Sequence, residues 1–139
     1  MTRYTDVILI DDTQSESEGS KILLLRRNPE SEFAPSKLCL PGGHLDDGFS
    51  LIDNAKKELE EETGIIATHL SKLDNFTFES GDETTVFYGF VGVVTDEVVH
   101  PMLTWREHVE YEWLTLDEID KRKDELIGED LYKILQEVS

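Results

Sequence analysis

The chain has 139 residues and a formal net charge of −18, with 31 acidic against 13 basic side chains. This length predicts one domain, residues 1–139, and the acidic charge opposes binding to a nucleic acid polymer, which depends on Lys and Arg at the phosphates. No apolar run is long enough to cross a membrane, and the only cysteine, Cys39, excludes an internal disulfide, so we expect a cytoplasmic protein.

The first part of the chain predicts short buried strands separated by polar loops. Apolar runs predict strands at Val7–Ile10 and Ile22–Leu25, and the acidic, serine-rich stretch between them predicts a loop. Residues 28–37 contain prolines and predict an irregular loop. Leu38–Leu40 predicts another strand, which a tight turn at Pro41-Gly42-Gly43 ends.

A helix with clear start and stop signals follows this turn. Ser50 opens a predicted capping box, and Gly64 predicts the C-terminal end. Glu58, Glu61 and Glu62 stand at positions i, i+3 and i+4, which places their carboxylates within roughly 100° of arc on one helix face. Like charges so close repel one another unless they share a cation. The helix therefore predicts a cation site beside the glycine turn.

The rest of the chain predicts further strands and a helical end. Ile65–Phe78 predicts a broken strand, and Thr84–Val94 a strongly β segment. Residues 109–113 alternate apolar and acidic side chains, which predicts a strand with one core face and one acidic face. A capping box at Thr115–Glu118 predicts a short helix, and residues 131–138 an amphipathic one. This order indicates an α/β fold with a mixed sheet between helices.

The segment from Gly43 to Ile65 resembles the Nudix box, G-x5-E-x7-R-E-U-x-E-E-x-G-U, in which U is an aliphatic residue. The Leu-Pro-Gly-Gly entry and the Trp113–Ile119 segment are also similar to that family. The resemblance implies an α/β/α sandwich around a central mixed β-sheet. It also implies a metal-dependent pyrophosphohydrolase that cleaves a nucleoside diphosphate linked to another moiety, or a (d)NTP, by attack of water on phosphorus. Seven of the nine fixed positions match: Gly43, Glu58, Leu59, Glu61, Glu62, Gly64 and Ile65.

The resemblance further implies which residues carry the chemistry. Glu58, Glu61 and Glu62 would bind Mg²⁺ or Mn²⁺, and one of them would accept the proton of the attacking water. The backbone carbonyl of Gly42 would be another ligand. An acid outside the box often completes the metal site in this family, and here Glu112 is the first candidate, followed by Glu110 and Glu107. For each of these three, a solvated charge at a sheet edge is the alternative.

Three residues outside the carboxylate set are candidate substrate contacts: His44, Arg26 and Trp105. His44 could contact a phosphate from the glycine turn, or be a turn residue only. Arg26 and Arg27 could bind phosphate bidentately, but neighbouring side chains on a strand point to opposite faces, so at most one faces the site. Trp105 lies in a predicted loop and could stack on a base or pack within the protein.

Two box positions depart from the pattern, with Phe49 at the first Glu and Lys57 at the Arg. In the resembling family these two are thought to pair. One interpretation is a structural swap in which Phe49 packs where the ion pair lay. A second is that loop rigidity, and with it activity, is lower. A third is that Asp46 or Asp47 supplies the missing acid.

Two rival functions follow from these departures and from the acidic composition. The first is a nucleotide-binding module that kept the fold and lost turnover, and the second is an acidic protein whose Glu-rich helix is only a solvated surface. The expected partner is a small nucleotide rather than a nucleic acid polymer or a membrane, and a homodimer stays open. Candidate substrates are oxidised dNTPs, ADP-ribose, NADH, dinucleoside polyphosphates and nucleotide sugars.

Overall fold

A computed structural model describes residues 2–11, 19–31, 35–67, 69–73, 76–80, 83–94, 108–127 and 129–138. Among these residues, no helix is long and apolar enough to cross a membrane. The elements in chain order are β1 (Thr2–Asp11), β2 (Lys21–Arg27), β3 (Leu38–Cys39), β4 (Gly42–His44), α2 (Leu51–Thr63), β5 (Ser71–Lys72), β6 (Phe76–Ser80), β7 (Glu83–Val94), β8 (His108–Thr115), α3 (Leu116–Lys121), the 3₁₀ turn η1 (Lys123–Glu125) and α4 (Glu129–Val138).

The strands form one mixed sheet in the order β3-β2-β1-β7-β5. The long strands β1 and β7 lie parallel at its centre, in register from Thr2 opposite Thr85 to Asp11 opposite Val94. Antiparallel pairs add β4 to β1, β6 to β7 and β8 to β2. A parallel pair needs a long crossover, and here the chain between β1 and β7 includes α2.

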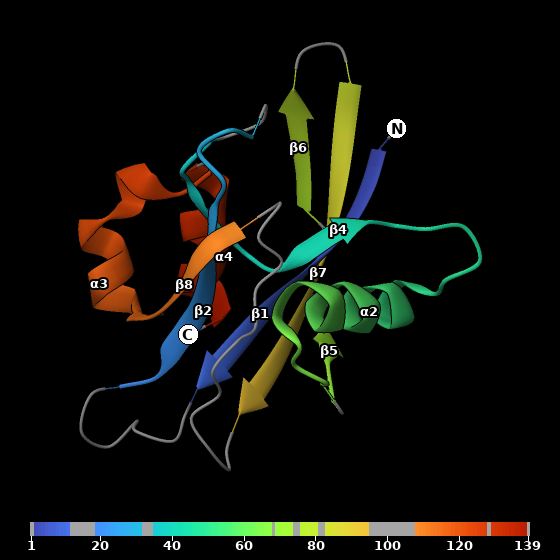
Figure 1. Ribbon diagram of the computed structural model, residues 1–139, viewed down its shortest axis with the longest axis horizontal. Helices are drawn as coiled ribbons and strands as arrows, with labels where there is room; N and C mark the ends of the chain where they lie inside the picture. Colours follow the sequence, from blue (N-terminus) through green and yellow to red (C-terminus); the bar gives the residue numbers. More distant parts are fainter. Residues whose placement is uncertain are drawn as a thin grey trace.

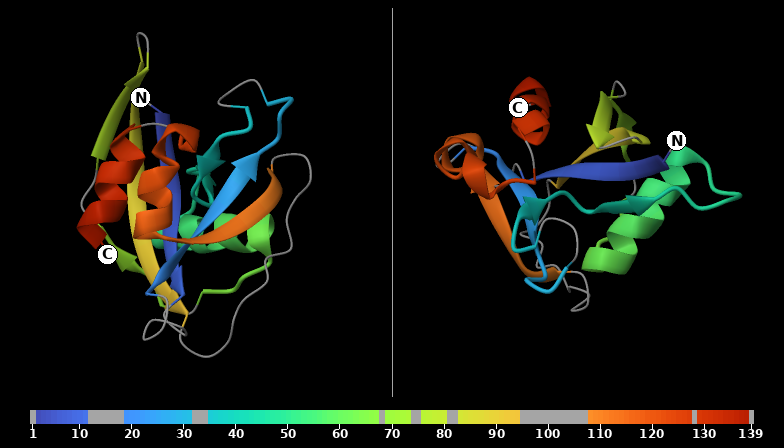
Figure 2. Two further views of the ribbon diagram at one scale, coloured as in Figure 1. Left: turned by 90° about the vertical axis from the view of Figure 1, so that its left-hand side faces the viewer. Right: turned by 90° about the horizontal axis from the view of Figure 1, so that it is seen from above.

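Alternating apolar side chains bury both faces of the sheet. Val7 and Leu9 of β1 pack with Ala55 and Leu59 of α2 in one core. Ile8 lies on the other face, in a second core that contains residues of α3 and α4. The two layers of helices on opposite sides of the sheet are visible in Figures 1 and 2. The predicted α/β/α sandwich is therefore confirmed, because a period of two along the strands divides their apolar residues between two helical layers.

The caps of α2 agree with the sequence signals. The Ser50 hydroxyl accepts the backbone N–H of Asp53 at 3.2 Å, and Gly64 adopts a left-handed conformation at φ 75° while its N–H bonds the Glu60 carbonyl. A side chain at Gly64 would be strained in this conformation. These caps fix the register of the helix, and with it the direction of the box carboxylates.

The segment after β3 differs from the prediction, because the expected turn at residues 41–43 leads into a short strand. Gly42–His44 pairs with β1, with Asp6 opposite Gly42 and Tyr4 opposite His44. A Cβ on Gly42 would lie 2.1 Å from Asp6 Oδ1 and 2.3 Å from the Thr5 carbonyl oxygen, so only glycine permits this approach. The predicted broken strand at 65–78 is likewise two short strands, β5 and β6.

A β-bulge interrupts the pairing of β2 with β8. Arg26 lies opposite Glu110, but the next residue, Arg27, lies opposite His108, so β8 has one extra residue at this point. Bulges of this kind change the face to which the following side chains point. The bulge brings His108 to the sheet face of Leu25 and Tyr111, which pack in the α2 core.

Candidate active site

The helix α2 brings two carboxylates of the box against the backbone of β4. Glu62 is only 3% exposed, and its Oε2 accepts the N–H of Gly42 over 3.4 Å. Glu58, one helical turn earlier, lies against Gly43, where an added Cβ would be 2.5 Å from Glu58 Oε2. Glu61 is different, since its side chain is 59% exposed. The structure therefore brings Glu58, Glu62 and the glycine backbone together, with Glu61 at the solvent side.

Lys57 supplies positive charge to this carboxylate group. Its Nζ lies 3.2 Å from Glu58 Oε1 and 3.8 Å from Glu61 Oε1. Burial raises the pKa of Glu58, and the neighbouring Lys57 ammonium opposes that rise. The hydrogen bond to Asp46, and then the charges of Glu58 and Glu61, hold the pKa of Lys57 well above its usual range. Lys57 therefore stays charged and lowers the repulsion within the cluster.

The two departures from the box are explained by the loop that precedes α2. Lys57 Nζ forms an ion pair with Asp46 Oδ2 and also lies 5.1 Å from the centroid of the Phe49 ring. Phe49 remains 45% exposed, so it contributes a cation–π contact rather than buried packing. Of the three interpretations, the structure favours the one in which Asp46 supplies the missing acid.

A buried amide that the sequence did not single out fixes this loop. Asn54 is fully buried, and its Nδ2 donates to Thr5 Oγ1 at 2.7 Å and to the His44 carbonyl at 3.0 Å. Its Oδ1 accepts the backbone N–H of Asp46 at 3.1 Å. These bonds join α2 to β1, to the end of β4 and to the loop, so Asn54 holds Asp46 in reach of Lys57.

We expect Asp46→Asn to lower turnover by about twofold to fivefold, the effect of losing one partly exposed ion pair. Adding Phe49→Glu to that variant should restore turnover, because it supplies a carboxylate at the position where the box has one. Steady-state rates of the single and double variants test this. Asp47→Asn, one residue along the same loop, is the matched control and should match the wild type. A loss with Asp47→Asn equal to that with Asp46→Asn would contradict the assignment.

A second buried group lies behind Glu62. His108 is 3% exposed, and its Nε2 is 3.5 Å from Cys39 Sγ, while its Nδ1 is 3.7 Å from Glu62 Oε2. Burial, and then the charge of Arg27, lower the pKa of His108 to about 4. Burial raises the pKa of Cys39 to about 12. The imidazole and the thiol are thus both neutral near pH 7.

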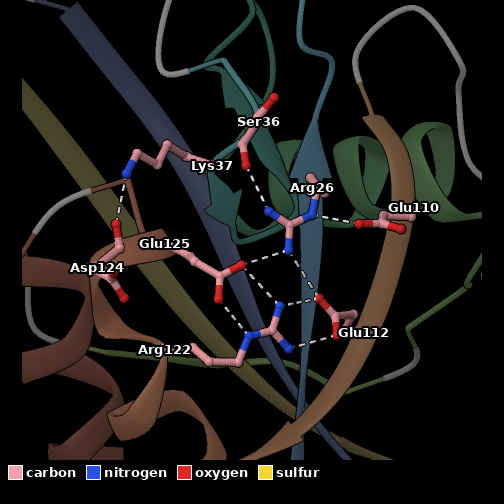
Figure 3. Close-up of polar contacts among 8 residues, drawn as sticks. All are labelled: Arg26, Ser36, Lys37, Glu110, Glu112, Arg122, Asp124 and Glu125. Atoms are coloured by element: carbon pink, nitrogen blue, oxygen red, sulfur yellow. Dashed lines mark hydrogen bonds and ion pairs between the residues drawn. The ribbon is translucent and has the colours of Figure 1, made fainter.

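Two predicted site residues, Arg26 and Glu112, lie on the other face of the sheet. Glu112 is opposite Leu24, which packs in the core of α3 and α4 rather than that of α2. Figure 3 shows both residues in an ion-pair cluster with Arg122 and Glu125. There Arg122 donates to both Glu112 oxygens at 2.7 Å, and Arg26 bonds Glu110 and Glu125. Of the two neighbouring arginines, it is Arg27 whose strand position faces α2.

The ion-pair cluster predicts an acid-sensitive contribution to stability. Hydrogen bonds from Arg122 hold the pKa of Glu112 below its usual range, and Arg122 and Arg26 lower that of Glu125 to about 2. The native state therefore binds fewer protons than the unfolded state, and the contribution present above about pH 4.5 is lost as the pH falls toward 2.

We expect Arg122→Met to lower the free energy of unfolding by about 1 kcal/mol at pH 7, a modest effect because Glu112 and Glu125 remain 29% and 35% exposed. The difference from the wild type should shrink below pH 4. Urea unfolding at pH 7 and pH 3 measures it, with Lys123→Met as the control for an exposed cation. An equal difference at both pH values would contradict the assignment.

Of the remaining predicted site residues, His44 is described by the structure, whereas Trp105 and Glu107 are not. His44 is exposed, and its ring lies 4.3 Å from that of Tyr4, which in turn stacks on Phe87 at 5.2 Å between centroids. These three residues form an aromatic row across β4, β1 and β7. An open depression is lined by His44, Asp46, Phe49 and Arg3, among other residues.

The donor set suits a hard divalent cation. Among the described residues, no three His, Cys, Asp or Glu side chains are close enough to hold a metal ion by themselves. Mg²⁺, however, is typically held by one or two carboxylates and completes its shell with substrate phosphates and water. Glu58 and Glu62 at the Gly42–Gly43 backbone fit that requirement, with oxygen donors only.

Comparison with known proteins agrees with the sequence resemblance. A family model described as NUDIX domain matches residues 1–137. The asymmetrical bis(5'-nucleosyl)-tetraphosphatase of Rattus norvegicus is 39% identical over 83 residues, which cover 56% of this chain and 55% of that protein. The 8-oxo-dGTP diphosphatase of Haemophilus influenzae is 35% identical over 75 residues, 54% of each protein. The chain therefore spans about half the length of these curated relatives.

Solved structures resemble the whole chain. A C. elegans Ap4A hydrolase in a binary complex has a TM-score of 0.77 at 17% identity, over 98% of this chain and 93% of that one. A NUDIX hydrolase from Nitrosomonas europaea has a TM-score of 0.77 at 21% identity, over 97% and 86% of the two chains. At these identities the likeness establishes the fold.

Proposed function

Because the chain belongs to the Nudix family, we propose that it is a metal-dependent pyrophosphohydrolase. In this proposal, water attacks a phosphorus of a nucleoside diphosphate linked to another moiety, or of a (d)NTP. The observation that carries the proposal is the convergence of Glu58 and Glu62 on the backbone of Gly42 and Gly43. Family membership independently supports a hydrolase that acts on pyrophosphate bonds.

The proposed chemistry divides between the cation and the protein. When bound, Mg²⁺ or Mn²⁺ supplies charge neutralisation of the pyrophosphate and acidifies a water. Glu58 and Glu62, with the Gly42 carbonyl, hold the cation, and one of the box carboxylates accepts the proton of the attacking water. Lys57 and Asp46 keep the loop against α2 while this occurs. His44 is the proposed phosphate contact, from the strand β4.

The partner we propose is a small nucleotide, and the compartment is the cytoplasm, where the single Cys39 stays reduced. The names of the relatives direct the choice of substrates. Dinucleoside tetraphosphates and 8-oxo-dGTP come first, because the two curated relatives are named for them. Both have the anhydride bond that the proposed chemistry requires.

The test is product analysis after incubation of the purified protein with Mg²⁺ and a panel of nucleotides. The panel contains diadenosine tetraphosphate, 8-oxo-dGTP, unmodified dNTPs, ADP-ribose, NADH and nucleotide sugars. Cleavage of one member supports the proposal, and the products identify the phosphorus attacked. Absence of cleavage with Mg²⁺, and again with Mn²⁺, would favour the rival binding module.

We also expect millimolar Mg²⁺ or Mn²⁺ to raise the melting temperature, because a ligand that binds only the folded state stabilises it. The increase should be larger with a nucleotide present, since phosphates complete the shell. Glu58→Gln should abolish most of the shift, and Glu60→Gln on the exposed side of α2 should keep it. No shift in the wild type under either condition would count against the carboxylate site.

A further inference from the structure

We infer that His108 is a positioning residue for Glu62, presenting its Nδ1–H to that carboxylate while Cys39 fixes the opposite side of the ring. The inference rests on the proposed function, because Glu62 is there a cation ligand. It assigns a role to two residues, His108 and Cys39, that lie outside the box. Neither of them contacts the cation in this role.

The first argument is the closed environment of the three side chains. His108 and Glu62 are 3% exposed, and Cys39 is 5% exposed. Within the described residues, His108 Nδ1 is the one buried side-chain nitrogen or oxygen without a hydrogen-bond partner. It lies 3.7 Å from Glu62 Oε2, somewhat beyond hydrogen-bond length. A buried polar nitrogen without a partner is unfavourable, and the acceptor that faces it is the Glu62 carboxylate.

The second argument is the tautomer of the ring. Cys39 Sγ lies 3.5 Å from Nε2, and the neutral thiol has one proton to donate. If Nε2 accepts that proton, the single ring proton is on Nδ1 and points toward Glu62. In the other tautomer the Nδ1 lone pair would face a carboxylate oxygen, which is repulsive. Glu62 therefore selects the Nδ1–H tautomer, and the Cys39 thiol is able to donate to the Nε2 lone pair of that tautomer.

The third argument is the backbone that brings His108 to this position. Regular alternation along β8 would put residue 108 on the face of Glu110 and Glu112, away from α2. The bulge at Arg26 and Arg27 sets His108 opposite Arg27 instead. Groups that orient a metal-ligating side chain typically change metal affinity by about 10- to 100-fold when they are removed.

The first test is made on the wild type, with one variant used only to assign the signal. ¹⁵N NMR of the imidazole rings in the metal-free wild type reports which nitrogen of His108 holds the proton, and we expect Nδ1. His108→Leu identifies the resonance. An Nε2–H tautomer would overturn the inference whatever the catalytic activity of the protein, since Glu62 would then face a lone pair.

The second test measures Mn²⁺ alone, titrated into the protein and followed by the EPR signal of the free ion. We expect His108→Leu to weaken Mn²⁺ binding by about tenfold or more. His108→Asn should restore most of the affinity, because its amide nitrogen takes the place of Nδ1. His108→Gln should not, because its nitrogen takes the place of Nε2. Melting temperatures of the three variants identify any that fail to fold.

The outcomes separate this inference from the proposed function. Equal Mn²⁺ affinity in the wild type and in all folded variants would overturn the role of His108 and leave the hydrolase proposal standing. An equal loss of Mn²⁺ affinity in His108→Asn and His108→Gln would also overturn the role of His108, since a purely structural role of the ring explains that result. No Mn²⁺ binding by the wild type would instead overturn the proposed cation site, and with it the role of His108.

Discussion

Glu62→Gln should lower kcat by roughly 100-fold or more while the protein stays folded. The loss follows from removal of a negative ligand, because several kcal/mol of transition-state charge stabilisation depend on the cation. The fold should survive because glutamine is nearly isosteric and its Oε1 can accept the Gly42 N–H that Glu62 accepts now. The measurement is kcat with the best substrate of the panel, with circular dichroism to confirm folding.

The matched control for this variant lies on the same helix. Glu60→Gln removes the same charge from an exposed position of α2, two residues earlier, and should change kcat less than twofold. A change under fivefold with Glu62→Gln would remove Glu62 from the mechanism. A large loss with Glu60→Gln would mean that the negative surface, not the placed carboxylate, sets the rate.

Alanine substitutions at the two adjacent glycines of β4 should have different effects, one on stability and the other on catalysis. Gly42→Ala should destabilise the protein by about 1–3 kcal/mol, because the new Cβ would meet the backbone oxygen of Thr5 at 2.3 Å and Asp6 Oδ1 at 2.1 Å. Neither β1 nor β4 can move without disturbing their pairing. The free energy of unfolding in urea measures this loss.

Gly43→Ala should instead leave the protein folded and lower its catalytic rate. Its Cβ would meet only the end of the Glu58 side chain, at 2.5 Å from Oε2, and that side chain can rotate away. We therefore expect a folded protein whose displaced Glu58 lowers kcat by roughly 100-fold, the scale of a 1 Å error in placement. Turnover within twofold of the wild type would contradict the position assigned to Glu58. Equal destabilisation by both alanines would contradict the distinction between the glycines.

The sequence predicted the parts of the site that depend on local signals. Ser50, Gly64 and the spacing of Glu58, Glu61 and Glu62 define a helix and its charged face without any knowledge of the rest of the chain. The resemblance to the Nudix box then predicted the fold that the structure and the comparisons confirm. Local periodicity carries this information because a helix is built from contacts between residues three and four apart.

The features of the site that the sequence did not predict depend on pairing between strands that are distant in the chain. Alternation placed Glu110 and Glu112 on one face of a strand, but it could not say that α2 covers the opposite face. The ion pairs of Arg26 with Glu112 and Glu125 could not be predicted either, because they depend on the register between β2 and β8. His108 had no signal at all, because a bulge is a property of two strands together. An ion-pair partner for Lys57 was foreseeable as one of several options, and the choice of Asp46 required the loop held by Asn54.

The bulge in β8 also bears on which changes of chain length the protein tolerates. Loss of Val109, the extra residue of β8 at this point, would give β2 and β8 an uninterrupted ladder and leave His108 opposite Arg27, on the α2 side. In the intact strand, an uninterrupted ladder would instead place Val109 opposite Arg27 and turn His108 away from Glu62, toward the layer of α3 and α4. A substitution near the bulge alters one side chain, whereas a shift of phase reassigns every residue on one side of it. Along this strand, spacing matters more than the identity of any single residue.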